Sequence, residues 1–290
     1  MKKFLLNGTS MLVLSMAIPA VTATAVQADD NLWTGGFVGI GAAGWMTTSP
    51  GEGGFGGDLD GYDNVVPHGS FYTEGNGDGG EDLFSGQGQI TTVEVGYDQQ
   101  SGSMVLGGFL SLDSAGVEAT GSWDDEWFSD LCEGYCGDAT VDAGVELGLT
   151  GTLGIRAGTL LTPNTLLYGT AGLSQATGTL FIGSTLEGFY EYEGEVDLSV
   201  RVPVDTANLS GESFGVGVEQ MLQDNWSIKA EYRTTNWHLP DSYGEGGWEG
   251  WTEGTGFSEN DGDTYGDMDG GIYIENLTSS SVRLLVTKRF

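Results

Sequence analysis

The sequence predicts an all-β protein whose eight strands form an antiparallel up-and-down barrel across a membrane. Three observations support this fold class. Eight runs alternate apolar and polar residues with a period of two. The connections between the runs are alternately short and long. Several runs also carry an apolar face opposite a charged face, which suits a wall between lipid and a polar interior.

Two of the runs show the alternation clearly. In ELGLTGTLGIRAG one parity is apolar, and the other holds glycine, threonine and Arg156. In NWSIKAEYRTTNW the apolar parity consists of Trp226, Ile228, Ala230 and Tyr232. We expect strands to begin near residues 36, 89, 103, 146, 165, 213, 225 and 279. Each run is close to the ~9 to 11 residues that a tilted strand needs to cross a bilayer.

The connections support a closed barrel over a sandwich. Three are tight, in QQSGS, TPNT and LQDN, and four are long, at residues 48–86, 120–143, 184–211 and 238–278. Strict alternation is typical of three short periplasmic turns and four long extracellular loops. The alternative is a secreted β-sandwich, which has no reason to sort its connections or to enclose charges.

The first 28 residues read as a secretory signal. Lys2 and Lys3 precede an apolar stretch, and VQA ending at Ala28 resembles a cleavage site, so residues 29–290 form the expected mature barrel. A membrane anchor is the alternative, but the apolar part is about half of the ~20 residues that a spanning helix needs. We therefore expect export to the outer membrane of a Gram-negative cell envelope.

The charge of the chain is strongly negative and unevenly placed. A formal net charge of −33 argues against nucleic-acid binding, because polyanions would be repelled. Within the long connections, residues 48–86, 120–140, 184–210 and 238–278 hold 30 of the 42 acidic residues, with Arg201 as their only basic residue. Two interpretations stay open: a solvated, repulsive surface, or a surface that binds cations.

Strand parity predicts a charged barrel interior. The inward positions are Glu94, Asp98, Asp113, Arg156, Glu219, Lys229, Glu231, Arg233 and Arg283, with Arg289 as a further candidate. Charges enclosed in a low dielectric are costly unless paired, so the near balance predicts an ion-pair network. The interior of an eight-stranded barrel is just wide enough for its own side chains, which favours a filled barrel. A small cation-favouring pore is the alternative.

Two loop motifs suggest local sites. NDGDTYGDMDGG presents carboxylates at Asp261, Asp263, Asp267 and Asp269, similar to part of an EF-hand calcium loop, although Tyr265 and Ile272 depart from its ligand pattern. We predict no other cofactor. Cys132 and Cys136 in LCEGYCG predict a disulfide in an oxidising compartment, with a metal pair as the lesser option.

The sequence does not predict an enzyme. His238 with Asp241, Ser242 and Glu245 could imitate a catalytic group at the outer rim, but such residues occur in any polar loop. An outer-rim enzyme is therefore the least favoured alternative. Aromatic residues of the loops could cap the barrel or anchor a surface partner, whose identity the sequence does not specify.

Three segments, LWTGGFVGIGAAGW, LLYGTAGL and FGVGVEQMLQDNWSIKAEYRTTNW, resemble the small porin-family outer-membrane barrels, eight-stranded relatives of the transmembrane domain of outer-membrane protein A. The ending SSSVRLLVTKRF resembles the carboxy-terminal signal read by the barrel-assembly machinery, with Phe290 as the signal residue and Lys288 as a departure. The resemblance implies contact with outer-membrane lipid and lipopolysaccharide, and a structural or surface-interaction role.

Overall fold

The computed structural model describes residues 32–48, 53–63, 69–77, 85–114, 116–129, 134–190, 194–240, 248–258, 264–274 and 277–290. The predicted signal segment, residues 1–28, lies outside this set. The described residues form β-strands, apart from turns and one short 3-10 helix, Gln223–Asn225. No helix among them has the length and hydropathy needed to cross a membrane.

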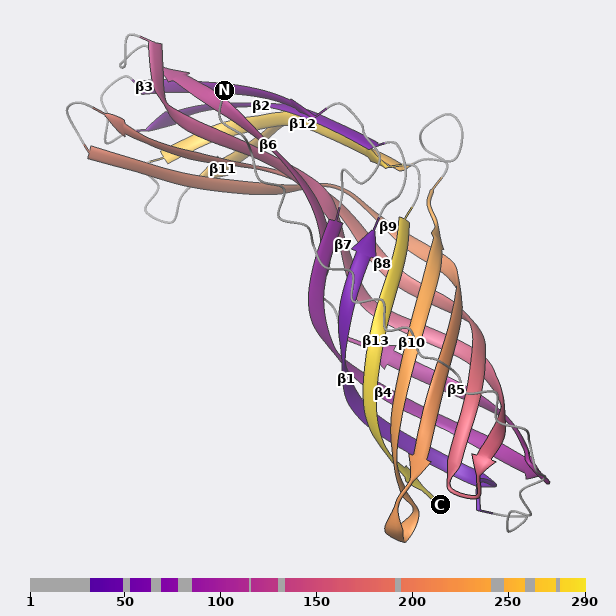
Figure 1. Cartoon of the computed structure of the whole chain (residues 1–290). Helices are drawn as coiled ribbons and strands as arrows, with labels where there is room; N and C mark the ends of the chain where they lie inside the picture. Colours follow the sequence, from indigo (N-terminus) through magenta and orange to yellow (C-terminus); the bar gives the residue numbers. More distant parts are fainter. Residues whose placement is uncertain are drawn as a thin grey trace, which may run out of the picture.

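Eight strands form a closed antiparallel ring (Figure 1). Around the ring the order is β1, β13, β10, β9, β8, β7, β5 and β4, and β4 pairs again with β1. The predicted eight-stranded barrel is therefore confirmed. The bounds of its strands are β1 Gly35–Thr48, β4 Ser85–Ser101, β5 Met104–Asp113, β7 Gly134–Thr162, β8 Thr165–Tyr190, β9 Gly194–Met221, β10 Trp226–His238 and β13 Leu277–Arg289.

The barrel closes between its first and last strands. β1 and β13 pair from Phe37 opposite Arg289 to Thr48 opposite Thr278. Beyond this ladder, the backbone N–H of Phe290 donates to the carbonyl of Gly36 at 2.9 Å. Gly35 adopts a φ of 143°, and a Cβ there would lie 2.2 Å from the Phe290 carbonyl oxygen, so only glycine fits. Closure leaves no strand edge in lipid.

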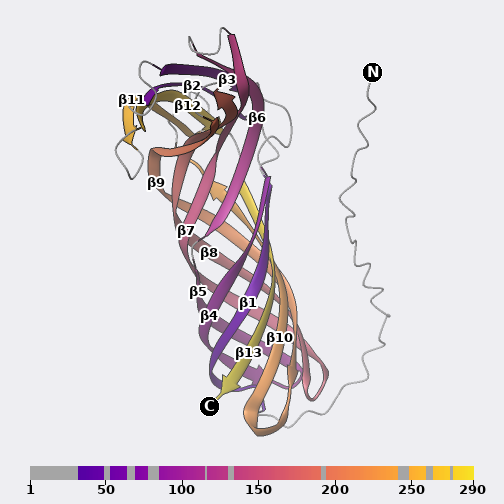
Figure 2. The ribbon, with the colours of Figure 1, turned by 90° about the vertical axis from the view of Figure 1, so that its left-hand side faces the viewer.

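The three short turns lie at the end of the barrel that also holds the C-terminus (Figure 2). They connect β4 to β5, β7 to β8 and β9 to β10. The last turn contains two consecutive left-handed residues, Asp224 with a φ of 57° and Asn225 with a φ of 60°. Both residue types tolerate this conformation. The predicted short connections are confirmed, and in outer-membrane barrels the end with the short turns faces the periplasm.

The four long connections, which the sequence predicted as loops, contain five further strands. They contain β2 Gly53–Asp63, β3 Gly69–Gly77, β6 Val117–Ser129, β11 Trp248–Ser258 and β12 Thr264–Ile274. These five strands follow β7 in the order β6, β3, β2, β12 and β11, and they form what we call the outer sheet. The upper parts of β7, β8 and β9 extend into it, and the sheet bends away from the barrel axis (Figure 1).

A β-bulge marks the junction between the barrel and the outer sheet. β7 pairs with β5 up to Thr150 and with β6 from Leu147 onward. Its register with β8 shifts between the same two residues. Bulges add twist and bend a strand, so β7 can leave the barrel wall at this level without losing its pairing to β8.

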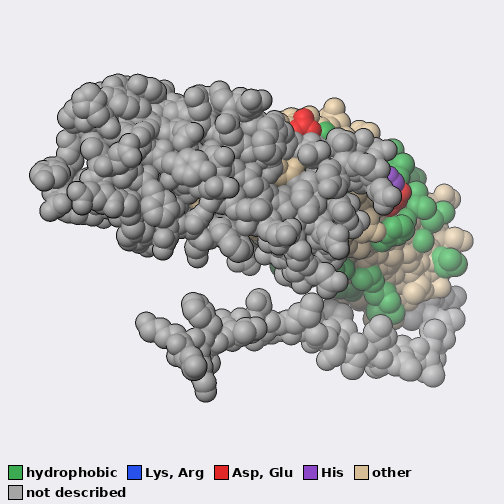
Figure 3. Space-filling view, turned by 90° about the horizontal axis from the view of Figure 1, so that it is seen from above, with side chains coloured by type: hydrophobic (Ala, Val, Ile, Leu, Met, Phe, Trp, Pro, Cys, Tyr) green, Lys and Arg blue, Asp and Glu red, His purple; other side chains and the backbone are tan. Residues whose placement is uncertain are grey.

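The outward face of the barrel carries the predicted apolar band. Leu153 and Leu173 are 68% and 69% exposed, whereas their inward-facing neighbours Thr152 and Ser174 are buried. In the view from above, hydrophobic side chains gather on the visible part of the barrel wall (Figure 3). Other members of the band include Val38, Ile40, Val93, Leu106, Ile155, Phe214, Val216, Ile228, Val282 and Leu284. This surface is complementary to hydrocarbon.

We predict that the folded protein will migrate differently on a gel before and after boiling in SDS. The closed ring satisfies its backbone hydrogen bonds internally, so unfolding in detergent is slow without heat. Gel migration with and without boiling, alongside circular dichroism, measures this. Identical migration together with a helical spectrum would contradict the barrel.

Candidate functional site

Charged side chains fill the middle of the barrel. Five carboxylates and five basic groups lie on the inward face, and each is at most 4% exposed. They come from six of the eight ring strands. The carboxylates are Glu94, Asp98, Asp113, Glu219 and Glu231, and the basic groups are Arg156, Lys229, Arg233, Arg283 and Arg289. The formal charges of this layer therefore cancel.

Arg156 organises the part of the network nearer the short turns. Its Nε donates to Asp98 at 2.7 Å, its Nη2 contacts the other oxygen of the same carboxylate, and its Nη1 donates to Glu219 at 2.8 Å. Arg289 contacts the same two acids at 2.7 and 3.2 Å. The Ser227 hydroxyl donates to Glu219 at 2.6 Å. Two cations thus share two carboxylates in a nearly dry site.

A second cluster lies farther from the turns. Lys229 Nζ lies 2.7 Å from a carboxylate oxygen of Glu94 and 3.1 Å from one of Glu231. Arg233 contacts Glu231 at 2.6 Å. Arg283 pairs with Asp113, which also accepts a hydrogen bond from Thr92 at 2.7 Å. The Nε atoms of Arg233, Arg283 and Arg289 have no hydrogen-bond partner in the described part of the chain.

Aromatic rings separate the cations from the barrel wall. The Arg156 guanidinium lies 4.5 Å from the Phe37 ring centroid, and Arg233 lies 4.9 Å from Phe109. The Phe109 ring covers Gly154 so closely that a Cβ there would lie 2.6 Å from the ring. Cation–π contacts in a desolvated site contribute about 2 kcal/mol or more, so the rings stabilise the network as well as filling space.

Apolar layers close the charged region on both sides. Near the short turns lie Trp33, Val105, Leu160, Leu166, Tyr168 and Met221. The Trp33 indole donates to the Pro163 carbonyl at 3.0 Å, and Arg289 stacks 4.8 Å from its ring. Toward the outer sheet lies a larger cluster that includes Ile90, Val117, Val145, Leu180, Ile182, Trp237, Ile272 and Leu277. The charges therefore lie between two hydrophobic plugs.

A row of hydroxyl groups lies between the charges and the outer apolar cluster. The hydroxyl oxygens of Thr152 and Ser174 are 2.7 Å apart, those of Ser174 and Ser213 are 2.5 Å apart, and those of Ser213 and Thr235 are 2.7 Å apart. Each hydroxyl can donate one bond and accept others. The row thereby satisfies buried polar groups on four adjacent strands, β7 to β10, without adding charge.

Arg201 forms an isolated basic site on the outward face above the bulge. It pairs with Glu118, lies 3.6 Å from Glu146, and stacks 3.5 Å from the Phe181 ring centroid. Burial raises the pKa of the neighbouring Asp142 carboxyl, Arg201 opposes this shift, and Glu118 adds to it. The cluster carries more acids than bases, so its stability depends on pH.

We predict that mild acid will stabilise the sheet around Asp142. A carboxyl whose pKa is raised in the folded state contributes stability that is present below its unfolded value of 3.8 and lost as the pH rises through the folded pKa. Asp142→Asn should therefore increase amide-exchange protection in β7 and β8 at neutral pH and flatten its pH dependence. Unchanged protection in this variant, with Thr206→Ala as the exposed control, would contradict the assignment.

His238 lies on the outer wall, where it pairs with a carboxylate. Its Nε2 is 2.7 Å from Glu212, and the two side chains are 62% and 45% exposed. The three residues predicted to accompany it in a catalytic group, Asp241, Ser242 and Glu245, lie outside the described residues. The described neighbours therefore form an exposed ion pair on the wall.

The predicted loop sites lie mostly outside the described residues. This holds for Asp261, Asp263 and Cys132, while Cys136, Asp267 and Asp269 lie in strands whose side chains are not described. The backbone places Asp267 and Asp269 within β12, opposite Asp60 and Asp58 of β2, so this half of the motif is a strand and not a loop. The calcium site and the disulfide stay predictions.

Trp33 belongs to the barrel interior, although the sequence pattern did not predict it there. Trp33 is fully buried, and its backbone N–H donates to the Gln100 side chain at 3.1 Å. It precedes the first strand, so period-two alternation does not reach it. Its only sequence signal is a large aromatic residue directly before the glycine-rich start of β1.

A closed ring of eight strands with an apolar lipid face and a polar interior defines an outer-membrane β-barrel protein. No family model matches the chain. It is 24% identical over 246 residues to the 31 kDa outer-membrane immunogenic proteins of Brucella melitensis and Brucella suis, which covers 79% of this chain and 82% of each relative. The chain is therefore a protein of the outer membrane, as predicted, and its resemblance to small outer-membrane barrels is confirmed.

Solved outer-membrane proteins align over most of the chain at low similarity. OprG of Pseudomonas aeruginosa gives a TM-score of 0.37 with 11% identity, covering 91% of this chain and 99% of that one. Ail of Yersinia pestis, described as an attachment invasion locus protein, gives 0.31 with 10% identity, covering 86% and 99%.

Proposed function

We propose that the protein is a filled barrel that anchors an acidic β-sheet outside the outer membrane, with a structural or surface-interaction role. One observation carries this proposal: the charged layer is neutral in sum and lies between two apolar plugs. Such an interior favours a barrel filled by its own side chains over a continuous polar path. The extension of β7, β8 and β9 into the outer sheet then presents that sheet on a rigid support.

A small pore is the alternative function, and single-channel recording separates the two. In planar bilayers we expect the folded protein to show no stable conductance steps, because water-filled lumens need wider barrels or an unpaired interior. Trp33→Ala removes the largest side chain of the apolar cluster near the short turns. This variant is the control in which that plug is weakened. Stable, cation-selective steps from the unmodified protein would overturn the filled-barrel proposal.

We infer no catalytic role. The described histidine, His238, pairs with Glu212 on the exposed outer wall and not with a nucleophile in a cavity. A catalytic group needs a nucleophile and a base within hydrogen-bond reach at a site that shelters a substrate. Among the described residues, no group of three or more His, Cys, Asp or Glu side chains could hold a metal ion.

We further propose lipopolysaccharide as the outer-leaflet contact and the barrel-assembly machinery as the partner during insertion. A groove of about 610 Å³ lies beside the bulge on β7, β8 and β9. Its polar lining consists of neutral amides and hydroxyls, which suit sugar hydroxyls better than phosphates. The lining residues are Leu149, Gln175, Ala176, Thr177, Asn208, Leu209 and Ser210.

A further inference from the structure

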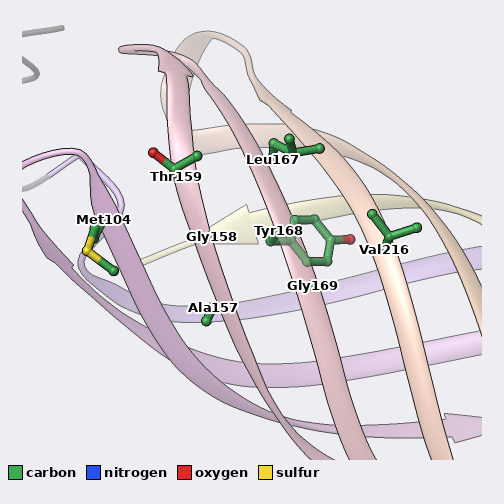
Figure 4. Close-up of a pocket in the computed structure, with 8 residues that line it drawn as sticks. All are labelled: Met104, Ala157, Gly158, Thr159, Leu167, Tyr168, Gly169 and Val216. Atoms are coloured by element: carbon green, nitrogen blue, oxygen red, sulfur yellow. The ribbon is translucent and has the colours of Figure 1, made fainter. Parts of the chain in front are cut away.

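A shallow notch lies in the lipid-facing wall of the barrel near the short turns. Its volume is about 470 Å³, and its lining comes from four neighbouring strands, β5, β7, β8 and β9 (Figure 4). Clefts of this volume are within the range of small-molecule sites. The lining residues are Met104, Ala157, Gly158, Thr159, Leu167, Tyr168, Gly169 and Val216.

The notch results from two small residues that pair directly across strands. Ala157 of β7 lies opposite Gly169 of β8. On one side Ala157 pairs with Leu106, and on the other side Gly169 pairs with Val216. Leu106 and Val216 are 62% and 54% exposed and project from the wall. The two small positions between them leave a hollow in an otherwise continuous apolar surface.

The lining does not open into the barrel. Tyr168 contributes to the floor of the notch, but its ring is turned inward and only 2% of the residue is exposed. Its hydroxyl donates to the interior carboxylate of Glu231 at 3.0 Å. The notch is therefore a feature of the outer wall, separate from the charge network.

The level of the notch places it in the periplasmic half of the membrane. Met104, the first residue of β5, pairs with Thr159 of β7, which also pairs with Leu167 of β8. β7 ends at Thr162 and β8 begins at Thr165. At about 3.3 Å per residue, Gly169 lies roughly 13 Å along the strand from Thr165. The notch thus begins within a few residues of the short turns.

A neutral polar rim borders the notch on the side of the turns. The hydroxyl oxygens of Thr162 and Thr165 are 2.7 Å apart, and Thr165 donates to the side-chain oxygen of Gln220 at 2.8 Å. All three side chains are uncharged; Thr162 and Gln220 are exposed, and Thr165 is half-buried. An apolar hollow next to a neutral hydrogen-bonding rim matches the division of a phospholipid into acyl chain and ester region.

We propose that the notch binds one acyl chain of a zwitterionic phospholipid of the periplasmic leaflet, with the ester region of the lipid at the Thr162, Thr165 and Gln220 rim. The notch is continuous with the face of the barrel that meets hydrocarbon, so an acyl chain is the molecule that reaches it. Lipopolysaccharide is excluded as the occupant because it belongs to the opposite leaflet. The rim offers no basic side chain to an anionic headgroup, so a zwitterionic headgroup is favoured.

Native mass spectrometry of the full-length folded protein tests this proposal, with phosphatidylethanolamine as the probe and phosphatidylglycerol as the anionic comparison. Gly169→Leu fills the hollow; a Cβ at that position meets its nearest atom at 3.7 Å, so the strand tolerates it. Gly44→Leu is the matched control. Gly44 faces outward, and a Cβ placed there would have no atom within 4 Å. It pairs with Val282, away from the notch.

We expect one phosphatidylethanolamine to stay bound to the parent protein and to Gly44→Leu. Gly169→Leu should lower the bound fraction about tenfold, which corresponds to about 1.4 kcal/mol. A change in gel migration after boiling in SDS shows that each variant is folded. Equal lipid retention in Gly169→Leu and the parent would overturn the proposal. So would a dimer of the parent that Gly169→Leu abolishes, since the notch would then hold a second copy.

Discussion

Arg156→Ala is expected to lower the free energy of unfolding by about 3 to 5 kcal/mol, the usual cost of removing one member of a buried ion pair. Arg156 is 1% exposed and contacts both Asp98 and Glu219. After the substitution Arg289 alone faces these two carboxylates. One negative charge then stays buried without a cation to balance it. Urea unfolding in lipid vesicles measures the loss.

Arg201→Ala is the matched control for this substitution. Arg201 also contacts two carboxylates, but it is 43% exposed and its partners are similarly open to solvent. Exposed pairs contribute about 0 to 1 kcal/mol. If Arg156→Ala destabilised the barrel by no more than Arg201→Ala, the interior would be wet enough to screen its charges. The pore would then become the better account of the fold.

A double substitution separates charge burial from packing. Lys229→Ala leaves Glu94 and Glu231 with fewer cations, whereas Lys229→Ala combined with Glu94→Ala removes one charge of each sign. Residues within one network couple by about 0.5 to 3 kcal/mol. We therefore expect the double variant to lose less stability than the sum of the two single variants.

The inward or outward direction of a side chain could be predicted because it is a local property. In β10 the observed burial alternates residue by residue along the strand, so Lys229, Glu231 and Arg233 all face inward. The partners of these charges could not be predicted. Lys229 meets Glu94 across 135 residues of chain. That pairing depends on the stagger of the strands around the ring, which no local pattern encodes.

The outer sheet was predicted as loops for a related reason. β2 reads GGFGGDLDGYD, and glycine and aspartate are both depleted in strands. In the structure, β2 is paired along both edges, with β12 on one side and β3 on the other. Neighbouring strands supply the hydrogen bonds that compensate for weak local preference. A single sequence gives no direct signal for such pairing when the side chains do not alternate.

The notch in the lipid-facing wall depends on strand register, which period-two alternation does not predict. Alternation correctly assigns Ala157 and Gly169 to the lipid side, but they form a hollow only because the register of β7 and β8 places them opposite each other. A shift of two residues would pair Ala157 with Ala171 or Leu167. The same outward residues would then give a different surface, so side-chain direction is local while surface shape requires the register.

Phe290→Ala is expected to reduce the amount of protein in the outer membrane several-fold while leaving the stability of the folded barrel nearly unchanged. Phe290 is 76% exposed, so its side chain packs little against the barrel. Its backbone N–H closes the seam to Gly36 at 2.9 Å, and alanine retains that hydrogen bond. A side chain that contributes little to packing yet ends an alternating strand fits the proposed role in recognition by the assembly machinery.

Deleting Phe290 tests the seam separately, because the deletion removes both the side chain and the backbone donor. Outer-membrane levels in cells and spontaneous refolding into lipid vesicles should be measured for both variants. If recognition is the role of the ring, both variants insert poorly in cells, but Phe290→Ala refolds in vesicles like the parent. If Phe290→Ala reached parental levels in cells while the deletion did not, Phe290 would act through the backbone bond that joins β13 to the start of β1.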